Sequence, residues 1–156
     1  MLPLLRVKHK DWEFSFRLDQ AEKEAAALPV TTATPEFEPT PEETSKFERI
    51  AEISPRAAIR EVRSDIEEAL ISLTKSANLL PQRPQSILGL TRLLRNREIL
   101  DHQTSALLDD LRAVGNQASH PSDKDFTKAE ALRYRALADQ VIRRLSAMEA
   151  KLGQNR

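Results

Sequence analysis

The chain of 156 residues is long enough for one domain and an appendage, and its 40% hydrophobic and 31% charged residues are typical of a soluble, globular or helical protein. The absence of cysteine excludes disulfides, thiolate metal sites and cysteine nucleophiles, and 24 basic and 24 acidic residues give no bulk attraction for nucleic acid. An aromatic content of 4% and only 3 glycines disfavour an all-β fold and favour helices.

The balance of charge differs between the two parts of the chain. Residues 1–53 contain 7 basic and 11 acidic side chains, and residues 54–156 contain 17 basic and 13 acidic ones. The second part is therefore mildly basic and rich in arginine. Such a composition is typical of a phosphate-binding surface and also of an ordinary solvated helix face.

The N-terminal segment, residues 1–28, begins with alternating apolar and polar side chains. This period of two predicts a short β-hairpin or one bent extended segment, which needs a surface to pack on because isolated hairpins are marginal in water. Residues 18–28 are rich in alanine and glutamate and predict a short surface helix. The alternating apolar residues are Leu5, Val7, Trp12, Phe14 and Phe16.

Residues 29–53 are rich in proline, glutamate and threonine. This composition predicts a stiff, acidic and disordered linker, and with it the one domain boundary of the chain. The prolines of the segment are Pro29, Pro35, Pro39 and Pro41.

Residues 54–153 predict four amphipathic helices joined by short links. Ser54 and Pro55 start the first helix, because serine accepts a backbone N–H and proline suits the first helical position. Thr127 and Glu130 form a capping box for the last helix. The predicted helices begin near residues 54, 86, 101 and 127 and end near 78, 95, 120 and 153. They predict an all-α fold, an antiparallel four-helix bundle.

The third predicted helix carries two stripes. Leu107, Leu111, Val114 and Ala118 recur at helical spacing and predict a buried face. Beside this face lies a polar stripe with a spacing of four residues. It consists of Arg112, Asn116 and His120. A line of Arg, Asn and His on one helix is either a solvated face or a functional site.

The simplest interpretation of these residues is structural. Arg112 has Asp109 one turn before it, and His120 lies where it can cap the last carbonyls of its helix. Gly115 and Asn116 are poor helix formers that together cost roughly 1–1.5 kcal/mol relative to alanine, which favours close packing or a site. On the first helix, Arg63 and Glu67 lie one turn apart, as a structural pair or as support for the site.

The motif Arg-x-x-Gly-Asn-x-x-x-His, formed by Arg112, Gly115, Asn116 and His120, resembles the signature helix of the HEPN superfamily of helical bundles. The residues 57–70 and 87–90 are similar to other parts of one bacterial HEPN-like domain. That domain has no assigned function and is often fused to restriction-enzyme subunits and other defence proteins. The resemblance covers residues 54–145.

The resemblance implies a metal-independent endoribonuclease that works as a homodimer in bacterial defence or a toxin-like system, with Arg112, Asn116 and His120 as catalytic residues and Arg63 and Glu67 in support. Histidine can transfer the proton of a ribose 2′-OH near neutral pH, and arginine can hold the charged phosphate oxygens. RNA is the implied partner, together with a protein of the defence system. No cofactor is implied, and His9 and His102 have no ligand-spaced partners that predict a metal site.

The alternative is a non-catalytic module for dimerisation or protein interaction. Seven residues separate Arg112 from His120, whereas the nuclease signature has four to six. The charge pattern does not predict a reader of DNA sequence. No apolar run reaches the ~20 residues of a membrane span, which predicts a cytoplasmic chain, although the chain also fits the soluble part of a membrane-anchored relative.

Overall fold

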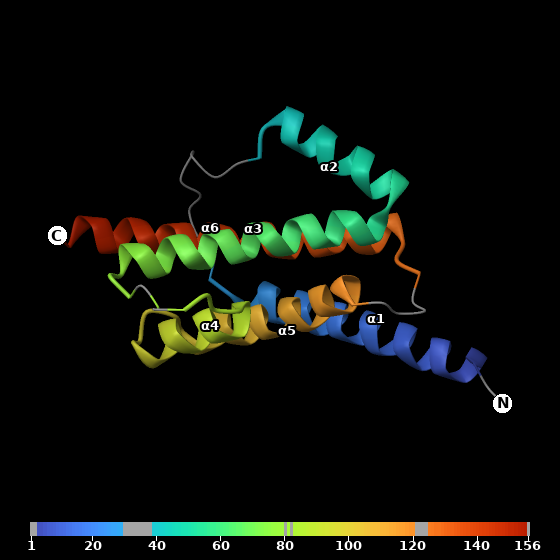
Figure 1. The fold of residues 1–156 in the computed structure, drawn as a ribbon, viewed down its shortest axis with the longest axis horizontal. Coiled ribbons are helices and arrows are strands. Elements are labelled where there is room, and N and C mark those ends of the chain that lie inside the picture. Colours follow the sequence, from blue (N-terminus) through green and yellow to red (C-terminus); the bar gives the residue numbers. More distant parts are fainter. Residues whose placement is uncertain (1–2, 30–38, 80, 82, 121–124, 156) are drawn as a thin grey trace.

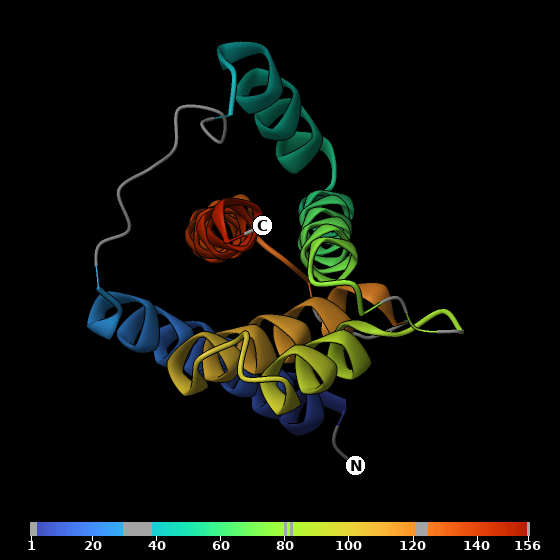
Figure 2. The same ribbon diagram turned by 90° about the vertical axis from the view of Figure 1, so that its left-hand side faces the viewer.

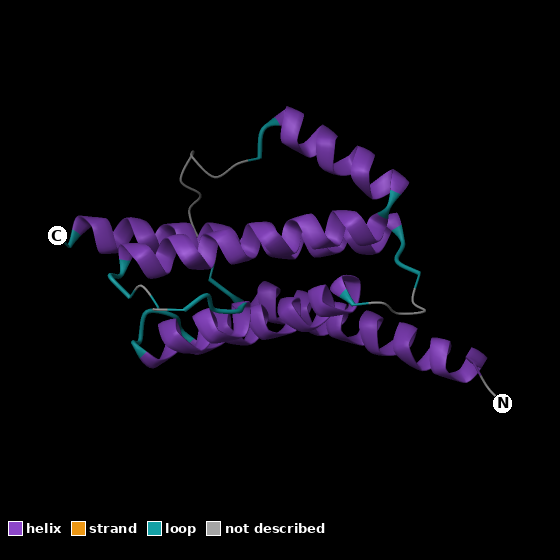
Figure 3. Ribbon diagram, in the orientation of Figure 1, coloured by secondary structure: helices purple, strands orange, loops and turns teal. Residues whose placement is uncertain are grey.

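The computed structural model describes residues 3–29, 39–79, 81, 83–120 and 125–155, with side chains from residue 13 onward. All regular structure in these ranges is helical, and no strand occurs among them (Figures 1 and 3). The all-α prediction is therefore confirmed. The helices are α1 (Pro3–Ala27), α2 (Pro41–Ile53), α3 (Pro55–Ser76), α4 (Ile87–Asn96), α5 (His102–Ser119) and α6 (Lys128–Gln154).

The last four helices begin where the sequence predicts them. The side chain of Ser54 accepts the backbone N–H of Ala57 at the start of α3, with Pro55 as the first helical residue. Thr127 and Glu130 form the predicted capping box at the start of α6. These caps explain the agreement, because they satisfy backbone donors that a helix start otherwise leaves unpaired.

The helices form two layers, and they do not make the predicted antiparallel four-helix bundle. Figure 2 shows α3 and α6 in one layer, α1, α4 and α5 in the other, and α2 outside the first. The helices α3 and α6 run in the same direction (Figure 1), and near their ends Ser72 donates a hydrogen bond of 2.9 Å to Glu149. The reason is that α4 runs in the same direction as α3, so that α5 runs back and α6 again has the direction of α3 (Figure 1). In agreement with this direction, Leu90 lines a pocket with Thr74, and Leu93 lines a second pocket with Leu79.

The predicted N-terminal hairpin is wrong, because residues 3–27 form the single helix α1. Its buried residues recur at helical spacing, whereas Phe16 of the alternating pattern is 51% exposed. The buried face packs against α5 and α6. Tertiary burial of this face therefore outweighs the local period-two pattern. The buried residues are Phe14, Leu18, Ala21 and Ala25.

The disordered linker predicted for residues 29–53 is wrong over residues 41–53, which form α2. Thr40 and Glu43 form a capping box at the start of α2. Pro41 is the first helical residue, where the backbone N–H that proline lacks would have no partner inside the helix. Phe47 and Ala51 are buried, and α2 contacts both α3 and α6. The residues 30–38 of the predicted linker lie outside the described residues.

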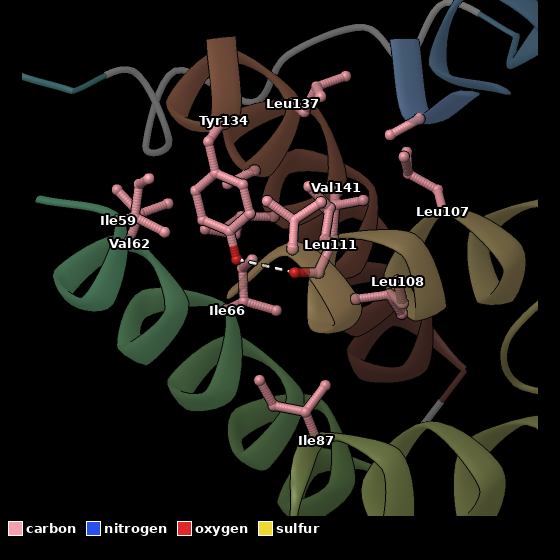
Figure 4. Close-up of a cluster of buried hydrophobic side chains, with 14 of the residues drawn as sticks. Ile59, Val62, Ile66, Ile87, Leu107, Leu108, Leu111, Tyr134, Leu137 and Val141 are labelled. Atoms are coloured by element: carbon pink, nitrogen blue, oxygen red, sulfur yellow. Dashed lines mark hydrogen bonds between the residues drawn. The ribbon is translucent and has the colours of Figure 1, made fainter. Parts of the chain in front are cut away.

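The core lies between the two layers, and α5 supplies much of it. Tyr134 of α6 is completely buried and donates a hydrogen bond of 3.1 Å to the carbonyl of Leu111 in α5 (Figure 4). Ile59 and Val62 of α3 and Val141 of α6 surround this contact. Among the described residues, no helix combines the length and apolar character that crossing a membrane requires.

Candidate functional site

The predicted polar stripe lies along the C-terminal half of α5, but its three residues differ in setting. The side chain of Arg112 is 28% exposed, Asn116 is half-buried and His120 is exposed. His120 is no longer helical, with φ −102° and ψ 148°, although its backbone N–H still donates to the carbonyl of Asn116 at 3.1 Å. His120 therefore ends the helix as its C-terminal cap and is not a further residue of the stripe.

Arg63 joins the stripe from α3. Its Nη2 donates a hydrogen bond of 3.2 Å to Oδ1 of Asn116, across the contact between α3 and α5. Gly115 makes this approach possible, since a Cβ at that position would lie 3.0 Å from Cδ of Arg63. The second supporting residue, Glu67, forms no ion pair with Arg63 and lines a separate pocket of about 330 Å³ with Ile71 and Leu90.

The two arginines of this site are incompletely paired within the described part of the chain. The Nε atoms of Arg63 and Arg112 are both buried and have no hydrogen-bond partner there. Arg112 has one ion-pair contact, with Asp109 at 3.9 Å, and that carboxylate is 46% exposed. An exposed pair of this length contributes little to stability. Within the described residues, each guanidinium group therefore keeps at least one donor without a partner.

The structure adds Arg56, which sequence reasoning did not select. Its Nη1 lies 3.2 Å from the carbonyl oxygens of Gln117 and Ala118 and 3.0 Å from that of His120. The last turn of α5 contains no basic residue of its own, so α3 supplies the cation that favours a helix C-terminus. No local pattern in the sequence reveals this contact, because more than sixty residues separate its partners.

Together these residues make one basic surface, which we call the α3–α5 face and define as Arg60, Arg63, Arg112, Asn116 and His120. Arg60 is exposed and lies one turn before Arg63 on α3. Asp109 is the carboxylate that contacts this face, through Arg112. Its composition suits an anionic group held by arginine forks.

Arg112 and His120 mark the two ends of the α5 part of the face. They are eight positions apart on α5, which corresponds to about 12 Å along a helix axis. Asn116 lies between them and accepts the hydrogen bond from Arg63. In a single chain the face therefore extends over about two turns of α5 and ends at His120.

A second polar feature, absent from the sequence prediction, is a cleft of about 520 Å³ between α2, α3 and α6. Burial raises the pKa of Asp65 and of Asp139, although Arg135 lies beside both and pairs with Asp139 at 3.0 Å. Among the described residues, no group of histidine and carboxylate side chains has the arrangement of a metal site. The acidic residues lining the cleft are Glu43, Asp65, Glu68, Asp139 and Glu149.

Comparison with curated proteins and with solved structures gives no significant match. One family model does match, over residues 45–155, and its description is "Domain of unknown function (DUF4145)". The match begins within α2 and includes all of α3 to α6, and with them the whole α3–α5 face. It does not include α1. Because the match spans more than half of the sequence, the chain belongs to this family of domains of unknown function, DUF4145.

Proposed function

We propose that the chain binds RNA through phosphate groups held on the α3–α5 face. The observation that carries this proposal is the hydrogen bond of 3.2 Å from Arg63 to Asn116, which brings an arginine of α3 into the stripe of α5. The face thus combines Arg63 of α3, bound to Asn116, with Arg112 one turn before Asn116 on α5. One guanidinium group can donate two hydrogen bonds to the oxygens of one phosphate, and its positive charge attracts a polyanion before contact.

The resemblance of the α5 motif to the HEPN signature favours RNA over other polyanions as the ligand. The same resemblance favours a role in bacterial defence. Histidine at the end of the face adds a group that can contact a ribose 2′-OH, which distinguishes RNA from DNA. The arginines alone do not read base sequence, because contacts to phosphates position a nucleic acid without specifying it.

A second candidate function is cleavage of RNA without a metal ion, and the exposed position of His120 favours it. In this reaction the 2′-oxygen attacks the adjacent phosphorus, the 5′-oxygen of the next nucleotide leaves, and the strand ends in a cyclic phosphate. His120 would take the proton of the 2′-OH or give one to the leaving oxygen, and Arg112 would stabilise the charged phosphate. As the resemblance to the HEPN superfamily implies, this function would use a homodimer in which His120 of one copy approaches Arg112 of the other.

The test of binding is fluorescence anisotropy with a labelled single-stranded RNA at several salt concentrations. We expect Arg112→Ala and Arg63→Ala each to weaken binding and to reduce the salt slope by about 0.7 per lost phosphate contact. Arg49→Ala is the matched control, because Arg49 is exposed on α2, on the other side of α3 from the face. Melting curves identify any variant that fails to fold.

The test of cleavage uses the same RNA in EDTA, with a 2′-O-methyl RNA as the resistant control. Cleavage should produce cyclic phosphate ends, and His120→Ala should slow it by about 10²–10⁴-fold. Binding without cleavage leaves the chain as an RNA-holding module. If the folded chain neither binds nor cleaves RNA, the proposal is wrong, and the alternative of a non-catalytic dimerisation or protein-interaction module takes its place.

A further inference from the structure

The end of α5 that carries His120 is held from outside the helix. Nη1 of Arg56 lies 3.0 Å from the carbonyl oxygen of His120 and 3.2 Å from those of Gln117 and Ala118. The last carbonyls of a helix have no partner inside the helix and are strong acceptors near its negative end. A single guanidinium group therefore binds the turn that determines where His120 leaves α5.

The guanidinium group of Arg56 itself packs on an aromatic ring. It lies over the ring of Phe126, 4.7 Å from the ring centroid, in cation–π geometry. Phe126 in turn meets the ring of Phe14 edge-on, with centroids 4.9 Å apart and an interplanar angle of 77°. Phe14 belongs to α1 and is completely buried. A continuous set of contacts thus joins α1 to the end of α5 through Phe126 and Arg56.

We propose that Arg56 is a positioning residue, which fixes His120 at the end of the α3–α5 face, and that α1 holds Arg56 in place through Phe14 and Phe126. This inference rests on the proposed function for the role of His120 in RNA binding. The positioning of His120 by Arg56 does not depend on RNA. It assigns a role to α1, which lies outside the part of the chain that matches the family. Nη1 of Arg56 is directed to three carbonyl oxygens at the end of α5, so the role proposed for Arg56 is positioning and not phosphate binding.

The experiment exchanges Arg56 for lysine in the full chain. Lysine keeps the positive charge but lacks the planar fork and stacks poorly on a ring. We expect Arg56→Lys to weaken RNA binding by about two- to tenfold, as His120→Ala does, because each removes the contact made by His120. The double variant should bind no more weakly than His120→Ala alone, since the two substitutions remove the same contact. Arg49→Lys on α2 is the control for the exchange itself.

A second measurement does not depend on RNA. The backbone N–H of His120 donates to the carbonyl of Asn116, so its hydrogen exchange reports whether the last turn of α5 is held. Exchange at His120 should become at least about tenfold faster in Arg56→Lys and in Phe126→Leu, whereas amides in the middle of α5 should be unchanged. Phe126→Leu removes the ring under the guanidinium group and keeps an apolar side chain.

The outcomes separate the two proposals. Unchanged exchange at His120 in both variants overturns the positioning role, whatever the RNA result. Additive losses of affinity in the double variant also overturn it, because Arg56 would then contact RNA independently of His120. If the wild-type chain does not bind RNA while exchange at His120 accelerates as expected, the proposed function fails and the positioning of His120 by Arg56 stands.

Discussion

The hydroxyl oxygen of Tyr134 lies 2.7 Å from the place that a Cβ on Gly115 would occupy. Tyr134 is completely buried, and its hydroxyl group is held by the carbonyl of Leu111 one turn earlier on α5. Gly115 therefore allows α6 and α3 of the same chain to approach α5. From the sequence, close packing of Gly115 against another helix was one interpretation, and the structure assigns that packing to Tyr134 and Arg63.

Gly115→Leu should destabilise the fold by about 3 kcal/mol or more, because overpacking of a rigid core costs about 1–3 kcal/mol for smaller additions. The ring of Tyr134 is completely buried, so it cannot turn into solvent to make room. Chemical denaturation followed by circular dichroism measures the change. Gly153→Leu is the control, because a Cβ there has nothing within 4 Å. Equal stability of the two variants would contradict the packing.

Tyr134→Phe should lower the free energy of unfolding by about 1 kcal/mol through loss of the hydrogen bond to Leu111. The ring remains, so the helices should stay in place and the circular dichroism spectrum should be unchanged. Denaturation at neutral pH measures the difference. A variant as stable as the wild type would show that the buried hydroxyl contributes nothing to the contact between α5 and α6.

The caps made most of the helices after residue 54 predictable, because Ser54 and Thr127 bind backbone donors close to them in sequence. The same capping chemistry starts α2, with Thr40 as the cap and Pro41 as the first helical residue, although the proline-rich composition of this segment predicts a linker. The direction of α6 relative to α3 was not predictable, because it depends on how the chain turns before α4.

The candidate site shows the same limit. The sequence predicts Arg112 and Asn116 because they recur along one helix, and Arg63 because it lies beside a predicted buried stripe. The sequence does not predict the contact of Arg56, since its partners at the end of α5 lie more than sixty positions away and no period connects them. A contact between two helices joins residues far apart in the sequence, so no short pattern predicts it. Caps and stripes join residues a few positions apart and can therefore be predicted.

The helical form of the N-terminal segment leads to a mutational test. Leu18→Ala should destabilise the chain by about 2–5 kcal/mol, because Leu18 is completely buried. Phe16→Ala should have a much smaller effect, because Phe16 is 51% exposed although it belongs to the alternating aromatic pattern. Thermal melting of both variants measures the difference. A larger loss at Phe16 than at Leu18 would favour an extended segment over α1.

The contact between α1 and α5 should make stability depend on pH. Burial, followed by the neighbouring carboxylates of Asp110 and Asp109, raises the pKa of Glu24 from 4.5 to about 7. The folded chain therefore keeps a proton on Glu24 over a range in which the unfolded chain has lost it. Since the folded state binds more protons between these two values, this group makes stability fall as pH rises from about 4.5 to about 7.

Glu24→Gln removes this titration and keeps a neutral side chain of similar shape. The variant should therefore be more stable than the wild type at pH 8 and nearly equal to it at pH 4.5, where Glu24 of the folded chain is already neutral. Melting temperatures of both proteins at the two pH values measure the difference. Glu48→Gln on α2, at an exposed position, is the control. If Glu24→Gln instead raised the melting temperature equally at both pH values, the gain would come from packing and not from the charge of Glu24 beside Asp110.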